Sequence, residues 1–256
     1  MTKKTVMITG ATSGIGKACA EKFAEHNWNI IITGRRKERL EELAINLNQK
    51  YDTKTKLLNF DIRKFSEVEE AFSSLDYNWK NIDVLINNAG LVMGLDPIDK
   101  GYVEDWDTMI DTNVKGLLYI SKHVIPNMIS RNSGHIINIG SIAGKETYAN
   151  GNVYCATKHA VDSLTKAMRI DLLKHNIKVT EINPGAVETE FSIVRFKGDK
   201  QAADNVYKGF KPLQASDVAG IIHYITTLPE HVNINDIVIM PTAQANTVHI
   251  NKNLFQ

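Results

Sequence analysis

Seven short runs of apolar, often β-branched residues alternate with longer stretches that carry charges at helical intervals, and this alternation limits the fold more than any other feature of the 256-residue chain. The runs are TVMIT (5–9), NIIIT (29–33), TKLLNF (55–60), DVLINN (83–88), GHIINIG (134–140), IKVTEIN (177–183) and DIVIM (236–240). Each run is apolar enough to be buried on both faces, as parallel strands flanked by helices are. The sequence therefore predicts an α/β fold with a doubly wound, seven-stranded parallel sheet and helices on both faces.

The stretches between these runs predict helices and a single domain. Helices are expected over residues 14–26, 37–49, 66–77, 104–132 and 153–175. No repeat of fixed period and no linker interrupts the alternation, so one domain over residues 1–256 is expected. Only the region from about 188 to 216 breaks the rhythm. Insertions of this length are often binding loops or lids, and disorder is the alternative.

Composition narrows the classes of partner. Thirty Lys and Arg against 29 Asp and Glu leave a formal net charge of +1, which favours neither nucleic acid nor an anionic membrane. Small molecules or further copies of the chain are the expected partners. The two cysteines, Cys19 and Cys155, have no Cys/His cluster nearby, so we expect reduced thiols, no metal site and a cytoplasmic location. No apolar run is long enough for a membrane span.

A glycine-rich turn follows the first run and leads into the first predicted helix. Its residues with an expected role in cofactor binding are Gly10, Thr12, Ser13, Gly14, Ile15 and Gly16. Glycines let the backbone approach a pyrophosphate, and the helix N-terminus offers unpaired N–H groups and a partial positive charge. A dinucleotide is the predicted ligand. The spacing differs from GxGxxG, and an ordinary strand-to-helix turn is the alternative.

Two arginines follow the second run, where an NAD enzyme has a carboxylate for the ribose 2′-hydroxyl. Arg35 and Arg36 can instead grip a 2′-phosphate, which favours NADP over NAD. The alternative is that they only begin the solvated face of a helix. Residues at the ends of the third and fourth runs are expected to border the adenine and its ribose; they are Asp61, Ile62, Asn88, Ala89 and Gly90.

Several motifs, taken in order, resemble the short-chain dehydrogenase/reductase family over nearly the whole chain. They are TGATSGIG (9–16), NNAG (87–90), Asn113 in DTNVKG, Ser141 after a strand, and Tyr154-x-x-x-Lys158. More narrowly, GRRKERL, EDWDTMIDTNVKGLLY, GHIINIGSIAG, EFSIVRFKGD and LPEHVNIN are similar to the NADP-dependent serine and 3-hydroxy acid dehydrogenases of bacteria and yeast, of the L-allo-threonine dehydrogenase type. The resemblance implies a Rossmann-type fold, NADP as cofactor, and a homotetramer built on the two long helices, with Val161, Leu164 and Met168 either at that contact or in the core.

The spacing of Tyr154 and Lys158 has a physical meaning. Residues four apart on a helix share a face, so the lysine stays close to the tyrosine side chain. A free tyrosine has a pKa near 10 and is seldom ionised at neutral pH, but a neighbouring positive charge stabilises the phenolate. The resemblance implies that, when an alcohol is oxidised, Tyr154 takes the hydroxyl proton while hydride passes to the nicotinamide. Reduction of the carbonyl compound uses the same steps in reverse. The alternative is an exposed helical pair.

The remaining roles come from the resemblance. It implies that Ser141 donates to the substrate oxygen and that Asn113 holds a water in a proton relay to Lys158, which requires a local break in helical bonding. A strand cap and a surface polar residue are the respective alternatives. The segment expected to meet the nicotinamide carboxamide comprises Pro184, Gly185, Val187 and Thr189.

Two cations in the insertion suggest an acidic substrate. Arg195 and Lys197 in SIVRFKGD are candidates to bind a substrate carboxylate beside Ser141 and Tyr154, with a solvated loop as the alternative. The expected substrates are 3-hydroxy acids such as serine, allo-threonine or 3-hydroxypropionate. A second possibility is an enzyme of the same kind whose substrate is another small ketone, a diol or a 3-oxoacyl compound. A non-catalytic NADP-binding redox sensor is a third, since fold alone allows it.

Overall fold

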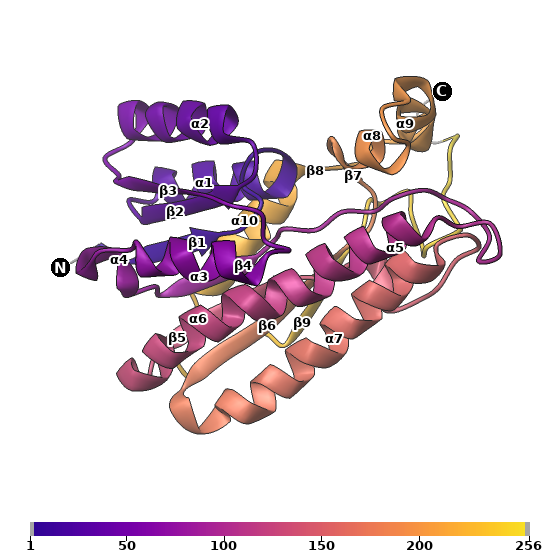
Figure 1. Cartoon of the computed structure of the whole chain (residues 1–256). Coiled ribbons are helices and arrows are strands. Elements are labelled where there is room, and N and C mark those ends of the chain that lie inside the picture. The colour runs from indigo at the N-terminus through magenta and orange to yellow at the C-terminus, as the bar shows by residue number, and fades with distance from the viewer. Residues whose placement is uncertain (1–2, 254–256) are drawn as a thin grey trace.

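A computed structural model describes residues 3–253, which fold around a seven-stranded parallel sheet (Figure 1). The strands are β1 (Thr5–Ile8), β2 (Asn29–Gly34), β3 (Thr55–Asn59), β4 (Val84–Asn87), β5 (Gly134–Ile139), β6 (Ile177–Pro184) and β9 (Asp236–Ile239). Their order across the sheet is β3-β2-β1-β4-β5-β6-β9, so the direction of winding reverses between β1 and β4. The predicted fold class is confirmed. In such a sheet the ligand crevice lies at the carboxyl ends of the two strands beside the reversal.

Helices cover both faces of the sheet. One face is covered by α1 (Gly14–Glu25), α2 (Lys37–Lys50) and α10 (Ala215–Thr226), and the other by α3 (Phe65–Ser73), α6 (Gly116–Arg131) and α7 (Asn152–Leu172). The short helix α4 (Tyr77–Lys80) follows α3, and the 3-10 turns η2 (Ile142–Gly144) and η3 (Leu173–His175) flank α7. The helix α10 was not predicted; a capping box between Gln214 and Asp217 fixes its start.

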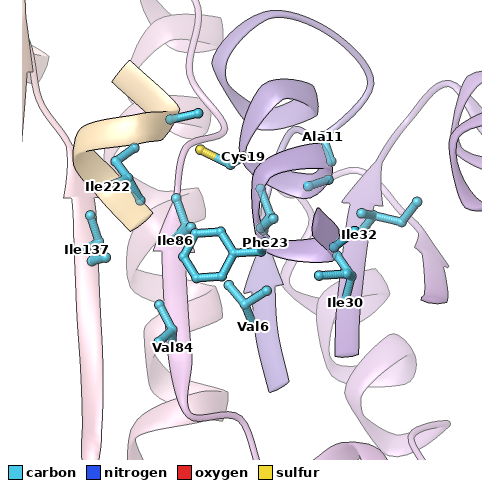
Figure 2. Close-up of a cluster of buried hydrophobic side chains, with 14 of the residues drawn as sticks. Val6, Ala11, Cys19, Phe23, Ile30, Ile32, Val84, Ile86, Ile137 and Ile222 are labelled. Atoms are coloured by element: carbon cyan, nitrogen blue, oxygen red, sulfur yellow. The ribbon is translucent and has the colours of Figure 1, made fainter. Parts of the chain in front are cut away.

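Two cores result from the alternation of side chains along the strands. In β1, Val6 and Ile8 face α1 and α10, whereas Met7 points to the opposite core beneath α6 and α7. Phe23 of α1 lies at the middle of the first core, between strands and the helix α10 (Figure 2). Val161 and Met168 of α7 are buried in the second core, and the partly buried Leu164 packs against it.

The helix predicted over 104–132 contains a change of winding. It consists of α5 (Val103–Ile110), a π-helical turn η1 (Asp111–Lys115) and then α6. Asn113 lies in the middle of the π turn and is buried. This is the local break in helical bonding that the resemblance implied, and such turns often occur at functional sites.

The insertion is folded. It contains the strand β7 (Val187–Glu188), the helices α8 (Phe191–Arg195) and α9 (Lys200–Tyr207), and the strand β8 (Leu213–Gln214), which pairs in parallel with β7. Figure 1 shows α8 and α9 standing apart from the main sheet near β7 and β8. Across residues 3–253, no helix has the length and apolarity that a membrane crossing requires.

Phe23→Ala should lower the free energy of unfolding by about 3–5 kcal/mol, because the ring is fully buried and its loss leaves a cavity. The measurement is urea denaturation. Tyr77→Ala is the matched control, since that aromatic side chain is 80% exposed, and it should change stability by no more than about 0.5 kcal/mol. Similar losses for both variants would contradict the assignment of Phe23 to the core.

Candidate active site

A cleft of about 360 Å³ lies at the carboxyl ends of the strands. The predicted site residues that line it are Gly10, Thr12, Ser13, Gly14, Ile15, Arg35, Arg36, Asp61, Ile62, Asn88, Ala89, Gly90, Ser141, Tyr154, Lys158, Pro184, Gly185, Val187 and Thr189. Gly16, Asn113, Arg195 and Lys197 lie outside this lining. The cleft is therefore continuous from the glycine-rich turn to the tyrosine and lysine of α7.

The glycine-rich turn is shaped by close backbone contacts. Gly10 has a φ of +68°, a conformation that favours glycine. A Cβ on Gly16 would overlap the carbonyl oxygen of Gly10 and lie 2.5 Å from Asn88 Nδ2. Gly16 thus serves the packing of the turn and not the surface of the cleft. Asn88 is also part of this packing, because its Nδ2 donates to the carbonyl of Thr9 at 2.8 Å.

The start of α1 is suited to an anion. Ser13 is the N-cap residue, but its side chain does not cap the helix. The N–H groups of the first turn are thus left for another acceptor, and the helix dipole favours a negative one. Both Ser13 and Gly14 line the cleft. These features fit the pyrophosphate of a dinucleotide.

Of the two arginines, Arg36 is the one that meets the glycine-rich turn. Its Nε and Nη2 donate to Thr12 Oγ1 at 3.0 and 2.6 Å, and Nη2 donates to Ser13 Oγ at 2.8 Å. Arg35 lies 3.9 Å from the carboxylate of Asp61. Together the guanidinium and two hydroxyls form a donor cluster that fits a phosphate group.

Asp61 is held by its neighbour Arg63. Arg63 Nε donates to both carboxylate oxygens at 3.0 Å, and Nη2 donates to Oδ2 at 2.6 Å. Burial raises the pKa of Asp61, but the hydrogen bonds from Arg63 outweigh it and leave the pKa below its usual range. The side chain is therefore a charged acceptor at the wall of the cleft.

Tyr154 and Lys158 lie on the buried face of α7. Lys158 Nζ is 5.9 Å from the centroid of the tyrosine ring and donates to the carbonyl of Ile139 at 2.8 Å. Phe191 packs edge-on against the same ring at 5.7 Å. Both polar side chains are thus removed from bulk water, so the alternative of an exposed pair does not hold.

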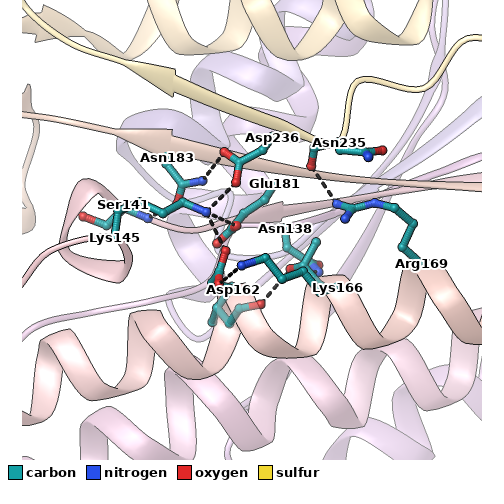
Figure 3. Close-up of polar contacts among 12 residues, drawn as sticks. Asn138, Ser141, Lys145, Asp162, Lys166, Arg169, Glu181, Asn183, Asn235 and Asp236 are labelled. Carbon is teal, nitrogen blue, oxygen red and sulfur yellow. Dashed lines mark hydrogen bonds and ion pairs between the residues drawn. The ribbon is translucent and has the colours of Figure 1, made fainter.

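The backbone at Ser141 is held by a cluster of polar side chains (Figure 3). Asn183 Oδ1 accepts the Ser141 N–H at 2.9 Å, and Asn183 Nδ2 donates to Asp236 at 3.0 Å. Lys145 ties that carboxylate to Asp162 and Glu181. The serine hydroxyl accepts the N–H of Ala143 at 3.1 Å, so Ser141 caps η2 and also faces the cleft.

Asn113 holds the segment after β4. Its Oδ1 accepts the N–H of Leu91 and its Nδ2 donates to the carbonyl of Leu91, both at 2.8 Å. The same Nδ2 donates to Thr157 Oγ1 at 3.0 Å, which joins the π turn to α7. Asn113 is therefore a buried link between the two walls of the cleft.

The structure separates the two cations of the insertion. Arg195 lies near the reactive side chains: its Cζ is 5.8 Å from the ring centroid of Tyr154, and its Nη2 donates to the Tyr148 hydroxyl at 2.8 Å. Lys197 has a φ of +52° and forms an ion pair with Asp105 at 2.8 Å, with its side chain 49% exposed. Only Arg195 is in reach of Tyr154.

Burial acts against charge on both reactive groups of α7. It raises the pKa of the Tyr154 phenol, although a hydrogen bond from Ser141 and the charge of Arg195 partly oppose this. It lowers the pKa of Lys158 to about 8, while Glu181 acts in the opposite direction. The sequence predicted that Lys158 and the oxidised nicotinamide would supply the stabilising positive charge, and the structure adds Arg195.

Several residues that line the cleft were not predicted as site residues; they are Thr33, Gly34, Phe60, Leu91, Thr112, Ile139, Gly140, Glu190, Phe191 and Val194. Glu190 and Phe191 lie in the insertion and line the cleft beside Thr189. Both belong to the stretch EFSIVRFKGD that contributes to the family resemblance, but no role was assigned to them, because their contacts depend on how the insertion folds back over α2 and α7. Nothing in the sequence predicted that the carboxylate of Glu190 would lie beside Arg36.

Comparisons with known proteins agree with this geometry. The family described as short chain dehydrogenase matches residues 4–200. An NADP-dependent 3-hydroxy acid dehydrogenase of Salmonella typhi is 47% identical over 241 residues, which cover 94% of this chain and 96% of that protein. A serine 3-dehydrogenase of Agrobacterium fabrum is 42% identical over 94% of this chain and 95% of its own. Among solved structures, the closed form of serine dehydrogenase complexed with NADP+ matches with a TM-score of 0.90 and 47% identity, covering 94% of this chain and 96% of the other.

Lys158 should titrate with a midpoint near pH 8 in the protein without cofactor, because burial disfavours its ammonium form. The measurement is NMR of protein labelled with ¹³C-lysine, with Lys158→Met identifying the resonance. Since the unfolded chain then binds more protons than the folded protein, the contribution of Lys158 to stability should rise between about pH 8 and 10.5. A midpoint at the ordinary value of lysine would contradict the burial of this amine.

Proposed function

The chain belongs to the short-chain dehydrogenase family, and we propose that it is an NADP-dependent dehydrogenase that interconverts a 3-hydroxy acid and its carbonyl form. The observation that carries the proposal is the convergence of Ser141, Tyr154 and Lys158 on one cleft, with Arg195 beside the tyrosine ring. Tyr154 as proton acceptor and Arg195 as partner of a carboxylate are thus close together. A short hydroxy acid, whose hydroxyl and carboxylate are only a few atoms apart, requires this.

The cofactor is NADP. Its pyrophosphate fits the first turn of α1, and its 2′-phosphate fits Arg36 with Thr12 and Ser13. Arg35, Asp61 and the 88–90 segment are proposed to border the adenine and its ribose, and residues 184–189 the nicotinamide. When bound, NADP accepts the hydride in oxidation and supplies it in reduction.

The residues of the chain move the proton. In oxidation, Tyr154 takes the proton from the substrate hydroxyl, and in reduction it returns a proton to the carbonyl oxygen. Ser141 donates a hydrogen bond to the same oxygen and stabilises the charge that develops on it. Positive charge on Lys158 and Arg195 stabilises the phenolate against the cost of its burial. Asn113 is proposed to hold a water that links Lys158 to solvent.

Arg195 is proposed to bind the substrate carboxylate. Its buried Nε has no hydrogen-bond partner among residues 3–253, and its Nη2 is held by Tyr148. A buried guanidinium nitrogen without an acceptor is costly, and a carboxylate would supply one. Lys197 is already paired with Asp105, so Arg195 is the better candidate of the two.

The location and assembly of the protein are further expectations. We propose a cytoplasmic enzyme of one domain over residues 1–256, with residues 188–216 as its substrate loop. A homotetramer is also proposed. Its contacts would need apolar side chains other than the buried Val161 and Met168, and α7 and η3 expose Ile170 and Leu173.

Tyr154→Phe should reduce turnover about 10²- to 10⁴-fold, because the phenol proton carries the acid–base step. NADP binding should change little, since the ring stays in place. Turnover is measured by nicotinamide absorbance with NADP and 3-hydroxypropionate, L-serine, L-allo-threonine or 3-hydroxyisobutyrate. Tyr77→Phe, at an exposed position, is the matched control and should retain full activity. If the unmutated protein oxidised no hydroxy acid and reduced no carbonyl compound, the alternative of a non-catalytic NADP-binding redox sensor would be favoured.

Arg195→Ala should raise the Michaelis constant for a 3-hydroxy acid about ten- to a hundredfold, equivalent to a charged contact of about 1.4–2.8 kcal/mol. The corresponding neutral alcohol should be affected much less, because it lacks the carboxylate. Lys197→Ala is the matched control in the same loop and should leave both substrates nearly unaffected. Equal losses for acid and alcohol would show that the loop, and not a carboxylate contact, had been disturbed.

A further inference from the structure

Glu190 places a carboxylate against the arginine that fits the 2′-phosphate. Its Oε2 accepts from Arg36 Nη1 at 2.7 Å. Arg39 Nη1 donates to both oxygens of the same carboxylate, at 2.7 and 2.9 Å. Arg36 and Arg39 lie at the start of α2, whereas Glu190 immediately precedes α8. The contact therefore joins the cofactor end of the cleft to the insertion.

The donors of Arg36 are almost fully used. A guanidinium has five N–H donors, and four are engaged here: three bonds to Thr12 and Ser13, and one to Glu190. One N–H remains, so a phosphate that takes the usual two bonds from Arg36 must displace a partner. The hydroxyls of Thr12 and Ser13 can rotate and donate to the phosphate themselves. A carboxylate can only accept and repels a phosphate, so Glu190 is the partner that must leave.

We propose that Glu190 is a residue that determines cofactor specificity. Its carboxylate occupies N–H donors of Arg36 and Arg39 until the 2′-phosphate of the cofactor displaces it. This inference rests on the NADP dependence proposed above. A cofactor without the phosphate leaves the Glu190 contacts intact and gains nothing from the arginines. Glu190 therefore weakens the binding of NADP but not that of NAD, and it sets how strongly the protein distinguishes the two.

The exposure of the three side chains predicts that Glu190 weakens NADP binding only moderately. The side chains of Arg36, Arg39 and Glu190 are 42%, 46% and 41% exposed, and ion pairs of this kind contribute little to stability. Displacement is therefore inexpensive for a phosphate that carries about two negative charges. The pKa of Glu190 is lowered, first by the hydrogen bond from Arg36, so the carboxylate is ionised at neutral pH.

The test is the binding of NADP+ and NAD+ to the intact protein, measured by isothermal titration calorimetry. Glu190→Gln keeps the size of the side chain and removes its charge. It should lower the dissociation constant of NADP+ about two- to fivefold and leave that of NAD+ unchanged. The pair 2′,5′-ADP and 5′-AMP, which differ only in the phosphate at issue, should show the same split. Glu188→Gln is the matched control, because Glu188 contacts Gln214 and should affect neither ligand.

Each outcome has a definite meaning. Weaker NADP+ binding in Glu190→Gln, an equal change for NADP+ and NAD+, or the same effect in Glu188→Gln would overturn the role of Glu190. None of these three outcomes concerns the preference of the unmutated protein for NADP+, so the proposed function would stand. Equal affinity of the unmutated protein for both cofactors would instead overturn the proposed NADP dependence, and the role of Glu190 with it.

Discussion

The site depends on the bonds that join the ends of β1 and β4. Thr9 Oγ1 accepts the N–H groups of Asn88 and Ala89 at 3.0 and 2.9 Å, and Asn88 Nδ2 returns a bond to the Thr9 carbonyl. These bonds satisfy backbone groups that would otherwise be buried without partners where the two strands end. They also hold the glycine-rich turn against the segment that leads to Asn113. The positions of both walls of the cleft therefore depend on the place where β1 and β4 end side by side and the winding of the sheet reverses.

Burial gives the reactive pair its character. Tyr154 and Lys158 are almost fully buried, and burial opposes charge on each of them. A phenol that resists ionisation remains a proton donor at neutral pH, whereas an acceptor role requires added positive charge. Two neighbouring groups supply such charge: Arg195 Cζ lies 5.8 Å from the centroid of the tyrosine ring and Lys158 Nζ lies 5.9 Å from it. Acid and base chemistry can therefore share one side chain.

The sequence predicted what local rules determine, and it failed where distant segments meet. The seven strands, the glycine-rich turn and the shared helix face of Tyr154 and Lys158 followed from apolar runs and motif spacing, and the irregular turn at Asn113 followed from the family resemblance. Spacing alone could not show that Gly16 packs the turn while its neighbours face the cleft. Nor could it distinguish Arg195 from Lys197, because a left-handed residue at 197 reverses the chain and sends the lysine to Asp105. That outcome depends on tertiary packing.

The insertion links the two ends of the cleft through a very short element. Glu190 immediately precedes α8 and Arg195 ends it, so the contact with the cofactor-side arginines and the contact with Tyr154 are one helix apart. Five helical residues span only about 7.5 Å. A backbone bond from Gly94 to the carbonyl of Arg195 fixes the far end of α8 to the opposite wall. The contact of Glu190 with Arg36 and the contact of Arg195 with Tyr148 therefore lie at opposite ends of one short helix, so the fold of α8 sets the position of a charged group at each end of the cleft.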